Sequence, residues 1–279
     1  TGMTGHTMKT GARVKAMSPT EPGPQPLAQI LFSQGFGTRR DCAGLVAGGE
    51  VAVWSGASAD AAPNGLRRTV TDPDERFDEE GLQLVVQGQN WICRTRSLVA
   101  LHKPTGYECS QKPSAWPSVI LLLPAPLRRR GMQPVGRLDQ DTTGLLLLTD
   151  DGAWIHRLTS PKHHVPKVYE VSCDRPVDAR QVSRLLEGVL LRDDPQPVRA
   201  QACEIVAERQ LRLTLVQGKY HQVKRMLAAV GNHVTGLHRS AFGGLVLGTD
   251  LAPGQWCWVD PQVVTGRPPV GQGLPSPRG

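Results

Sequence analysis

Several features are missing from the 279 residues, and each absence excludes a class of protein. No apolar run approaches the roughly 18 residues that a membrane-spanning helix needs, so we expect no membrane segment. The N-terminal residues contain no apolar core of a signal peptide. The six cysteines form no CxxC pair, which argues against zinc ribbons and thioredoxin-like chemistry. We therefore expect reduced thiols and a cytoplasmic protein.

Signatures of a bound cofactor are also missing. The sequence has no Gly-rich nucleotide-binding loop. His156, His163 and His164 lie close together, but no cysteine or further histidine completes a recognisable metal-ligand spacing. Phosphate contact by these histidines and Lys162 explains the cluster better. We expect a protein that binds no metal and needs no cofactor.

Charge is unevenly distributed along the chain. The net charge of +7 and the pI near 9.3 indicate a polyanionic partner. Residues 103–138 hold six basic side chains and one acidic one, and residues 219–239 hold four basic side chains and no acid. Residues 72–80 hold six acids and one arginine, so we expect them to face away from a polyanionic partner. Basic runs are often only solvated faces, but these two flank a candidate site, which favours a nucleic-acid surface.

The most informative stretch is PVGRLDQDTTGLLLLTDDG, residues 134–152. Its four consecutive leucines, 145–148, show no polar alternation, which predicts a strand buried on both faces. Asp139 comes just before this strand, where a rigid core holds a catalytic group well. A surface turn with a local ion pair between Arg137 and Asp139 is the alternative, because Asp is common in turns.

The length of the chain favours two domains. We expect a disordered extension over 1–24 and a small domain with its linker over 25–88. A larger domain over 97–262 and a disordered tail over 263–279 complete the predicted organisation. The two terminal segments are rich in Pro, Gly, Ser or Thr and lack a periodic apolar pattern.

The first domain begins with a helical pattern. Apolar residues at helical spacing predict a first helix from Leu27. Thr38 is the expected N-cap of a second helix, which Gly48 ends. Val51 and Val53 then alternate as in a strand. A generic helical hairpin explains this pattern as well as a dedicated RNA-binding unit does.

The larger domain shows further periodic segments. The predicted elements are a strand over 98–101, a strand over 167–173, a helix over 177–191, strands over 203–206 and 211–216, and a helix over 222–230. Tyr169 falls on the second of these strands, where packing in the core is the commoner fate of a tyrosine. Lys224 and Arg225 lie off the buried stripe of the last helix, and solvent exposure is the usual fate of such residues.

Residues 134–152 resemble the signature GRLDxDTxGLLLLTxDG of the RNA pseudouridine synthases, in the branch that includes the RsuA-type rRNA enzymes. The segments KVYEV and GKYHQVKRM support the resemblance. The resemblance implies that Asp139 is the catalytic carboxylate and that Lys224 pairs with it. It also implies that Tyr169 packs on the uracil and takes part in proton transfer. The activity it implies is an isomerisation, without cofactor, of uridine in rRNA.

The segment before the larger domain resembles the small RNA-binding domain named after ribosomal protein S-four, with Thr38, Arg39 and Arg40 at the expected helix start. Lys103 lies in a turn that relatives share, and Leu237 and Arg239 match an element near the uracil pocket. Arg137 is a candidate for a neighbouring phosphate or for the gap left by a flipped base. The residues expected to contact RNA are Arg39, Arg40, Lys103, Arg137, Arg225, Leu237 and Arg239.

The fold implied is α+β, with an S-four-like domain and a larger domain built on a mixed, mainly antiparallel sheet with a central cleft. We expect a monomer that acts on small-subunit rRNA. Large-subunit enzymes usually carry Asn-Arg-Gln-Val-Arg-Arg where this chain has residues 220–225, YHQVKR. A large-subunit rRNA enzyme and a non-catalytic ribosome-assembly factor are the alternatives. A metal-dependent nuclease fits poorly, because Asp139 and Asp141 make a weak metal-binding pair.

Overall fold

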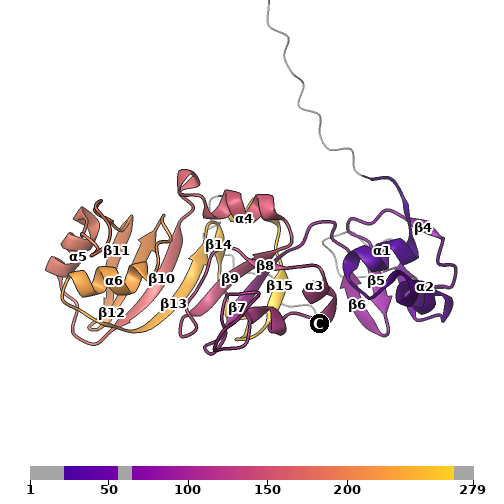
Figure 1. The fold of residues 1–279 in the computed structure, drawn as a ribbon, viewed down its shortest axis with the longest axis horizontal. Coiled ribbons are helices and arrows are strands. Elements are labelled where there is room, and N and C mark those ends of the chain that lie inside the picture. The colour runs from indigo at the N-terminus through magenta and orange to yellow at the C-terminus, as the bar shows by residue number, and fades with distance from the viewer. Residues whose placement is uncertain (1–21, 56–64, 267–279) are drawn as a thin grey trace, which may run out of the picture.

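The structure is a computed structural model that describes residues 22–55 and 65–266 (Figure 1). The expected disorder before residue 22 and after residue 266 lies outside the described residues. Residues 263–265 belong to a helix, so the predicted start of the C-terminal tail is too early. Within the described ranges the chain is α+β, as predicted.

The N-terminal unit contains two helices, a four-stranded antiparallel sheet in the order β3-β2-β5-β6, and a short β1–β4 pair. Its elements are β1 (Gln25–Pro26), α1 (Leu27–Gln34), α2 (Arg39–Ala47), β2 (Val51–Trp54), β3 (Arg67–Val70), β4 (Arg76–Phe77), β5 (Gln83–Val86) and β6 (Gln89–Ile92). Gly35 ends α1 in the left-handed conformation that glycine adopts freely. Thr38 caps α2, and the Asp41 side chain completes a capping box. Both predicted helices are confirmed.

The larger unit is built on a nine-stranded sheet in the order β11-β12-β10-β13-β9-β7-β15, with β8 and β14 attached at its sides. Its elements are β7 (Leu98–Lys103), η1 (Val119–Leu122), α3 (Ala125–Arg129), β8 (Gln133–Pro134), β9 (Thr143–Thr149), α4 (Gly152–Thr159), η2 (Pro161–His163), β10 (Lys167–Cys173), α5 (Ala179–Glu187), β11 (Ala202–Ala207), β12 (Gln210–Leu215), α6 (Gln222–Ala229), β13 (Val234–Phe242), β14 (Leu245–Val246), β15 (Trp256–Trp258) and α7 (Pro261–Thr265). Its strand pairs are antiparallel except for β13 with β9 among the described residues. The predicted mixed, mainly antiparallel sheet is confirmed.

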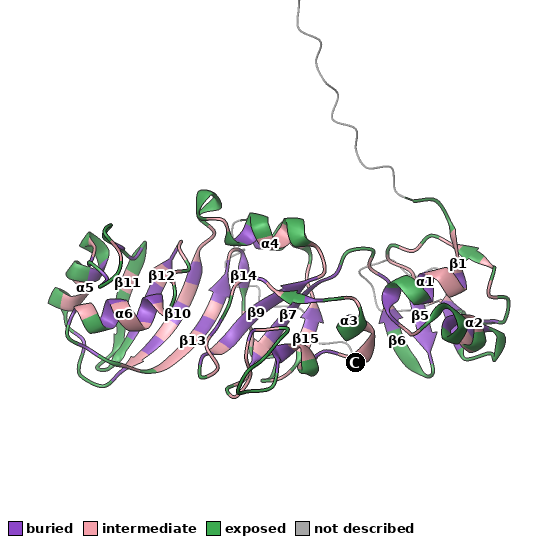
Figure 2. Cartoon of the chain, viewed as in Figure 1, coloured by how far each residue is buried: buried purple, intermediate pink, exposed green. Residues whose placement is uncertain are grey.

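Strand β9 is buried on both faces, as its run of leucines predicts. Leu146 and Leu148 belong to the core that also takes in residues of α3, α5 and α6. Leu145 and Leu147 face the opposite way, into a core that includes residues of α4 and α7. Figure 2 shows buried residues along the whole of β9, whereas β11 at the sheet edge is largely exposed.

The two units share one continuous core. Trp91 of β6 contacts Trp256 and Trp258 of β15, with ring centroids 6.5 and 5.6 Å apart. Arg130, at the end of α3, donates hydrogen bonds to the carbonyl oxygen of Arg94 and the side chain of Gln34. The N-terminal unit is therefore packed against the end of the large sheet that carries β15.

Two elements differ from their predicted form. Helix α5 covers Ala179–Glu187 rather than 177–191, because Gly188 ends it with a positive φ. Ala52 is buried together with Val51 and Val53, so β2 does not alternate strictly. No helix among the described residues is long and apolar enough to span a membrane.

Candidate active site

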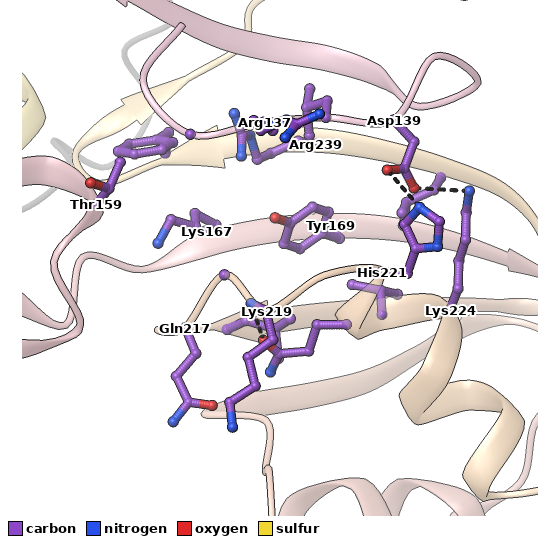
Figure 3. A pocket seen from close by; sticks show the side chains of 18 of the residues that line it. Arg137, Asp139, Thr159, Lys167, Tyr169, Gln217, Lys219, His221, Lys224 and Arg239 are labelled. Carbon is purple, nitrogen blue, oxygen red and sulfur yellow. Dashed lines mark hydrogen bonds and ion pairs between the residues drawn. The ribbon is translucent and has the colours of Figure 1, made fainter. Parts of the chain in front are cut away.

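A pocket of about 290 Å³ lies over one face of the large sheet (Figure 3). Its floor comes from β10, β12 and β13, and its walls come from the loop before β9 and the start of α6. This volume is just below the roughly 300–1,000 Å³ of typical small-molecule sites.

Asp139 stands at the mouth of the pocket, in the loop between β8 and β9. The preceding Leu138 is buried and anchors the loop in the core. The backbone oxygen of Asp139 accepts a hydrogen bond of 3.1 Å from the amide of Thr142, which forms a turn. The side chain is thereby held on a rigid element but stays partly accessible.

Lys103 supports this loop from below, which corrects the prediction that it contacts RNA. The side chain is fully buried at the end of β7. Its Nζ donates to the carbonyl oxygens of Pro104, Gln140 and Thr142 at 3.0, 3.1 and 2.8 Å. Burial lowers the pKa of Lys103. Because all three bonds go to backbone of the turns around Asp139, Lys103 positions that turn and has no face toward a ligand.

Two basic side chains from the start of α6 contact the carboxylate of Asp139 (Figure 3). Nζ of Lys224 lies 3.0 Å from Oδ2, and Nε2 of His221 lies 3.1 Å from Oδ1. Lys224 also contacts both carboxylate oxygens of Asp141, at 2.9 and 3.2 Å. Burial alone would lower the pKa of Lys224, but hydrogen bonds to Asp141 and Asp139 outweigh it and raise that pKa. Lys224 is therefore a firmly charged partner for Asp139.

His221 is a site residue that the sequence reasoning missed. It precedes α6 with φ +48°, a left-handed conformation that is uncommon for a residue with a side chain. Its ring stacks on Tyr220, with centroids 3.8 Å apart. The signal available in the sequence was its place in the YHQVKR segment, but no pattern there indicates an Asp139 contact.

The other predicted pocket residues come together from different strands. Tyr169 of β10 is buried, lines the pocket and pairs in register with Arg239 of β13. Arg239 also lines the pocket, but it is buried, and its Nε donates to the Leu145 carbonyl at 2.8 Å. Leu237 and the exposed Arg137 line the pocket as well. Arg239 is thus part of the pocket floor rather than of an open RNA surface.

Three predicted RNA contacts lie away from this pocket. Arg39 and Arg40 are exposed at the start of α2 in the N-terminal unit. The guanidinium of Arg39 lies 4.3 Å from the ring centroid of Phe32. Arg225 forms an ion pair with Asp193 and a 3.0 Å hydrogen bond to the Tyr220 carbonyl. The structure therefore does not bring these arginines to Asp139.

The chemistry available in the pocket is that of a carboxylate, an aromatic ring and several cations. Residues 22–55 and 65–266 contain no group of three or more His, Cys, Asp or Glu side chains placed to hold a metal ion. A carboxylate in contact with two basic side chains and beside a buried tyrosine suits attack on, or charge stabilisation of, a planar substrate.

Comparison with known proteins identifies the family. The model of the family "RNA pseudouridylate synthase" matches residues 97–229. The ribosomal small subunit pseudouridine synthase A of Escherichia coli K12 is 46% identical over 156 residues, which cover 56% of this chain and 67% of that protein. The same-named protein of Yersinia pestis is 39% identical over 193 residues, 69% of this chain and 78% of that protein. A crystal structure of a pseudouridylate synthase covers 86% of this chain and 98% of its own, with TM-score 0.58 and 32% identity. The chain belongs to the RNA pseudouridine synthase family of isomerases.

Proposed function

We propose that this protein converts a uridine of small-subunit rRNA into pseudouridine, with Asp139 as the catalytic carboxylate. The observation that carries the proposal is the carboxylate of Asp139 at the pocket mouth, held by Lys224 at 3.0 Å and His221 at 3.1 Å. Relatives from two bacteria are named for the small ribosomal subunit, and this supports the choice of substrate.

The reaction makes specific demands on the pocket. The N1–C1′ bond must break, the uracil must turn, and C5 must join C1′ and lose its proton. A carboxylate beside the glycosidic bond attacks or stabilises the electron-poor centre. Lys224 and His221 would hold the Asp139 carboxylate in position, and Tyr169 would pack on the ring and take part in the proton transfer from C5.

RNA binding follows from the surroundings of the pocket. The target nucleotide must leave its stack, which costs a few kcal/mol. Arg137, exposed beside the pocket, would contact a neighbouring phosphate or fill the gap. We assign residues 25–88 to an S-four-like RNA-binding domain, with Arg39 and Arg40 on phosphates, and residues 97–265 to the catalytic domain. The first domain raises the effective concentration of RNA at the second.

Tritium release from C5-labelled uridine tests the proposal. Wild type, D139N and D141N would be compared on small-subunit and large-subunit rRNA, each free and as partly assembled particles. D141N is the matched control, because Asp141 also contacts Lys224 but does not line the pocket. We expect release from small-subunit rRNA, abolished in D139N and largely kept in D141N.

The other outcomes separate the alternatives. Release from large-subunit rRNA alone would keep the chemistry and overturn the substrate. D139N releasing tritium at the wild-type rate would refute the role of Asp139. Tight RNA binding without release from any substrate would support a non-catalytic assembly factor.

A further inference from the structure

Two basic side chains on the pocket floor have no acidic partner among the described residues. Lys167 is 7% exposed and Arg239 is 2% exposed. Nζ of Lys167 makes no hydrogen bond or ion pair within the described part of the chain, and lies 5.4 Å from the centroid of the Phe242 ring. Nη2 of Arg239 is buried without a hydrogen-bond partner there. Neither group is used in the roles proposed above for Asp139, Lys224 and Tyr169.

The sheet register brings the two cations to the same place. Lys167 pairs with Phe242 and Tyr169 pairs with Arg239 across β10 and β13. The Arg239 guanidinium lies 5.0 Å from the centroid of the same Phe242 ring. In Figure 3, Tyr169 lies between Lys167 on one side and the Asp139 group on the other, with Arg239 beside Tyr169. A base packed on Tyr169 would therefore have Asp139 near one edge and the two cations near another.

The close approach of β9 fixes Arg239 in this position. Gly144 of β9 has φ +111°, and a Cβ there would lie 2.2 Å from the Arg239 carbonyl oxygen. Only glycine fits such a contact. Arg239 can then donate its Nε to the Leu145 carbonyl at 2.8 Å, which leaves Nη2 free of protein partners. The guanidinium is thus rigid before any substrate arrives.

Two buried cations without counter-ions destabilise the folded chain. Burial, reinforced by the nearby charge of Arg239, lowers the pKa of Lys167 to about 8. Among the residues lining the pocket, Asp139 is the acidic one, and Lys224 already pairs with it. A lysine with a strongly lowered pKa in a pocket typically marks a group that meets a ligand. The pocket is therefore built for a ligand that brings negative charge or carbonyl oxygens to this end.

We propose that Lys167 and Arg239 bind a carbonyl oxygen of the uracil and stabilise the negative charge that the ring carries while it is detached from the sugar. This inference rests on the proposed function. When the N1–C1′ bond breaks, its electron pair stays on N1, and conjugation spreads the charge to O2 and O4. After the ring turns, C5 bonds to C1′ and loses its proton, and N1 takes up a proton. Fixed cations aimed at such an oxygen stabilise the transition state without reorganising.

A backbone phosphate is the other ligand with suitable oxygens, but the position of the cations disfavours it. Lys167 and Arg239 lie at the floor of the pocket and are buried. Arg137 lines the same pocket and is exposed, so it suits a phosphate at the surface better. A uracil carbonyl reaches the floor when the base enters the pocket. The two ligands predict different kinetic effects and can be separated.

The test compares K167M and K167R with wild type in the full chain. We expect K167M to lower the single-turnover rate constant of tritium release by ~10²–10³-fold, with less than twofold change in RNA affinity. K167R, which keeps the charge, should retain more activity. The thermal midpoint of K167M should equal or exceed that of wild type, because the variant removes a buried unpaired charge. If Lys167 instead served to stabilise the fold, the thermal midpoint of K167M would be lower than that of wild type.

A substrate change makes the test specific for a carbonyl oxygen. The modified uridine would be replaced by 2-thiouridine or 4-thiouridine, because sulfur is a weaker hydrogen-bond acceptor, and product would be followed by chromatography after digestion. One of the two sulfur substitutions should lower the rate constant of the wild type. The same substitution should lower the rate constant of K167M little further, because K167M has already lost the contact with that atom. Fully additive losses for both would overturn the inference.

Other results would also overturn it. A weaker RNA affinity with an unchanged rate constant at saturation would assign Lys167 to a phosphate. A lower thermal midpoint with inactivity of both variants would assign it to the fold. If wild type is active and D139N is inactive but K167M matches wild type, this inference fails alone. If wild type releases no tritium from any RNA, the proposed function itself fails.

Discussion

Replacing Arg130 by Met should loosen the junction between the two units and weaken the fold. Arg130 is 6% exposed and forms an ion pair with Asp150, Nη2 to Oδ2, at 2.8 Å. Its guanidinium also donates to the carbonyl oxygens of Arg94 and Thr95, at 2.8 and 3.1 Å, and to the side chain of Gln34 at 3.2 Å. One side chain thus joins the end of α3 to the N-terminal unit.

The magnitude follows from burial. In R130M, Asp150 keeps one hydrogen bond of 2.8 Å, from the Ser97 amide, and its side chain is only 14% exposed. Removing one partner of a buried ion pair typically costs about 3–5 kcal/mol, because the other charge stays buried. The Arg96–Asp151 pair is a matched control at 3.2 Å, since Arg96 is 69% exposed. Exposed pairs contribute about 0–1 kcal/mol, so R96M should change the free energy of unfolding little.

Urea unfolding of R130M, D150N, the double variant and R96M would measure these differences. We expect R130M to lose about 3–5 kcal/mol and the double variant to lose less than the sum of the single changes. RNA affinity should also fall in R130M, because the N-terminal unit is held less firmly against the large unit. Equal losses in R130M and R96M, or strict additivity of R130M and D150N, would refute the reasoning.

Three further predictions concern the site. In H221N, asparagine tolerates the left-handed backbone at this position, but its side chain is too short to reach Asp139. The single-turnover rate constant should fall ~10–100-fold, with unchanged RNA affinity. An unchanged rate constant would show that the 3.1 Å contact between His221 and Asp139 is not used in the reaction. The pKa of Lys167 is about 8 in the folded chain and 10.5 as its ordinary value. Between these two pH values the unfolded chain therefore binds more protons than the folded chain, so the free energy of unfolding rises with pH through that window. The free energy of unfolding of K167M should therefore exceed that of wild type by up to ~3 kcal/mol at pH 7 and match it at pH 10.5. The same difference between the two proteins at both pH values would contradict the assignment. R40M should weaken RNA binding and make the affinity less dependent on salt, by the amount expected for the loss of about one phosphate contact. The rate constant at saturating RNA should stay unchanged, and a lower rate constant at saturation would place Arg40 in catalysis.

Local patterns in the sequence were enough for much of the fold. The unbroken leucines of β9 and the alternation of β10 reflect burial on two faces and on one face, and both follow from strand geometry alone. The cap at Thr38 depends on residues three apart, which sequence also displays. Such features are predictable because their causes are local.

The errors at the site have non-local causes. Lys103 was predicted to contact RNA because it lies in a turn that relatives share and in a basic run beside the candidate site. Its burial depends on three carbonyl groups, two of them from a turn about 40 residues away. His221 was missed because its contact with Asp139 joins two segments that are distant in sequence. Sequence can show which residues are present in a motif, but not which backbone atoms or charges meet them after folding.

The arrangement of the pocket follows from one feature of the sheet. Strands β9 and β13 run parallel, with Gly144 paired to Arg239. The turn that carries Asp139 immediately precedes β9, and Arg239 lies between β9 and β10 on the pocket floor. The same pairing therefore places an anion at the mouth and a cation at the floor, with Arg239 beside Tyr169 (Figure 3). A substitution at Gly144 that separated these strands would disturb both ends of the pocket together, because a Cβ there meets the Arg239 backbone at 2.2 Å.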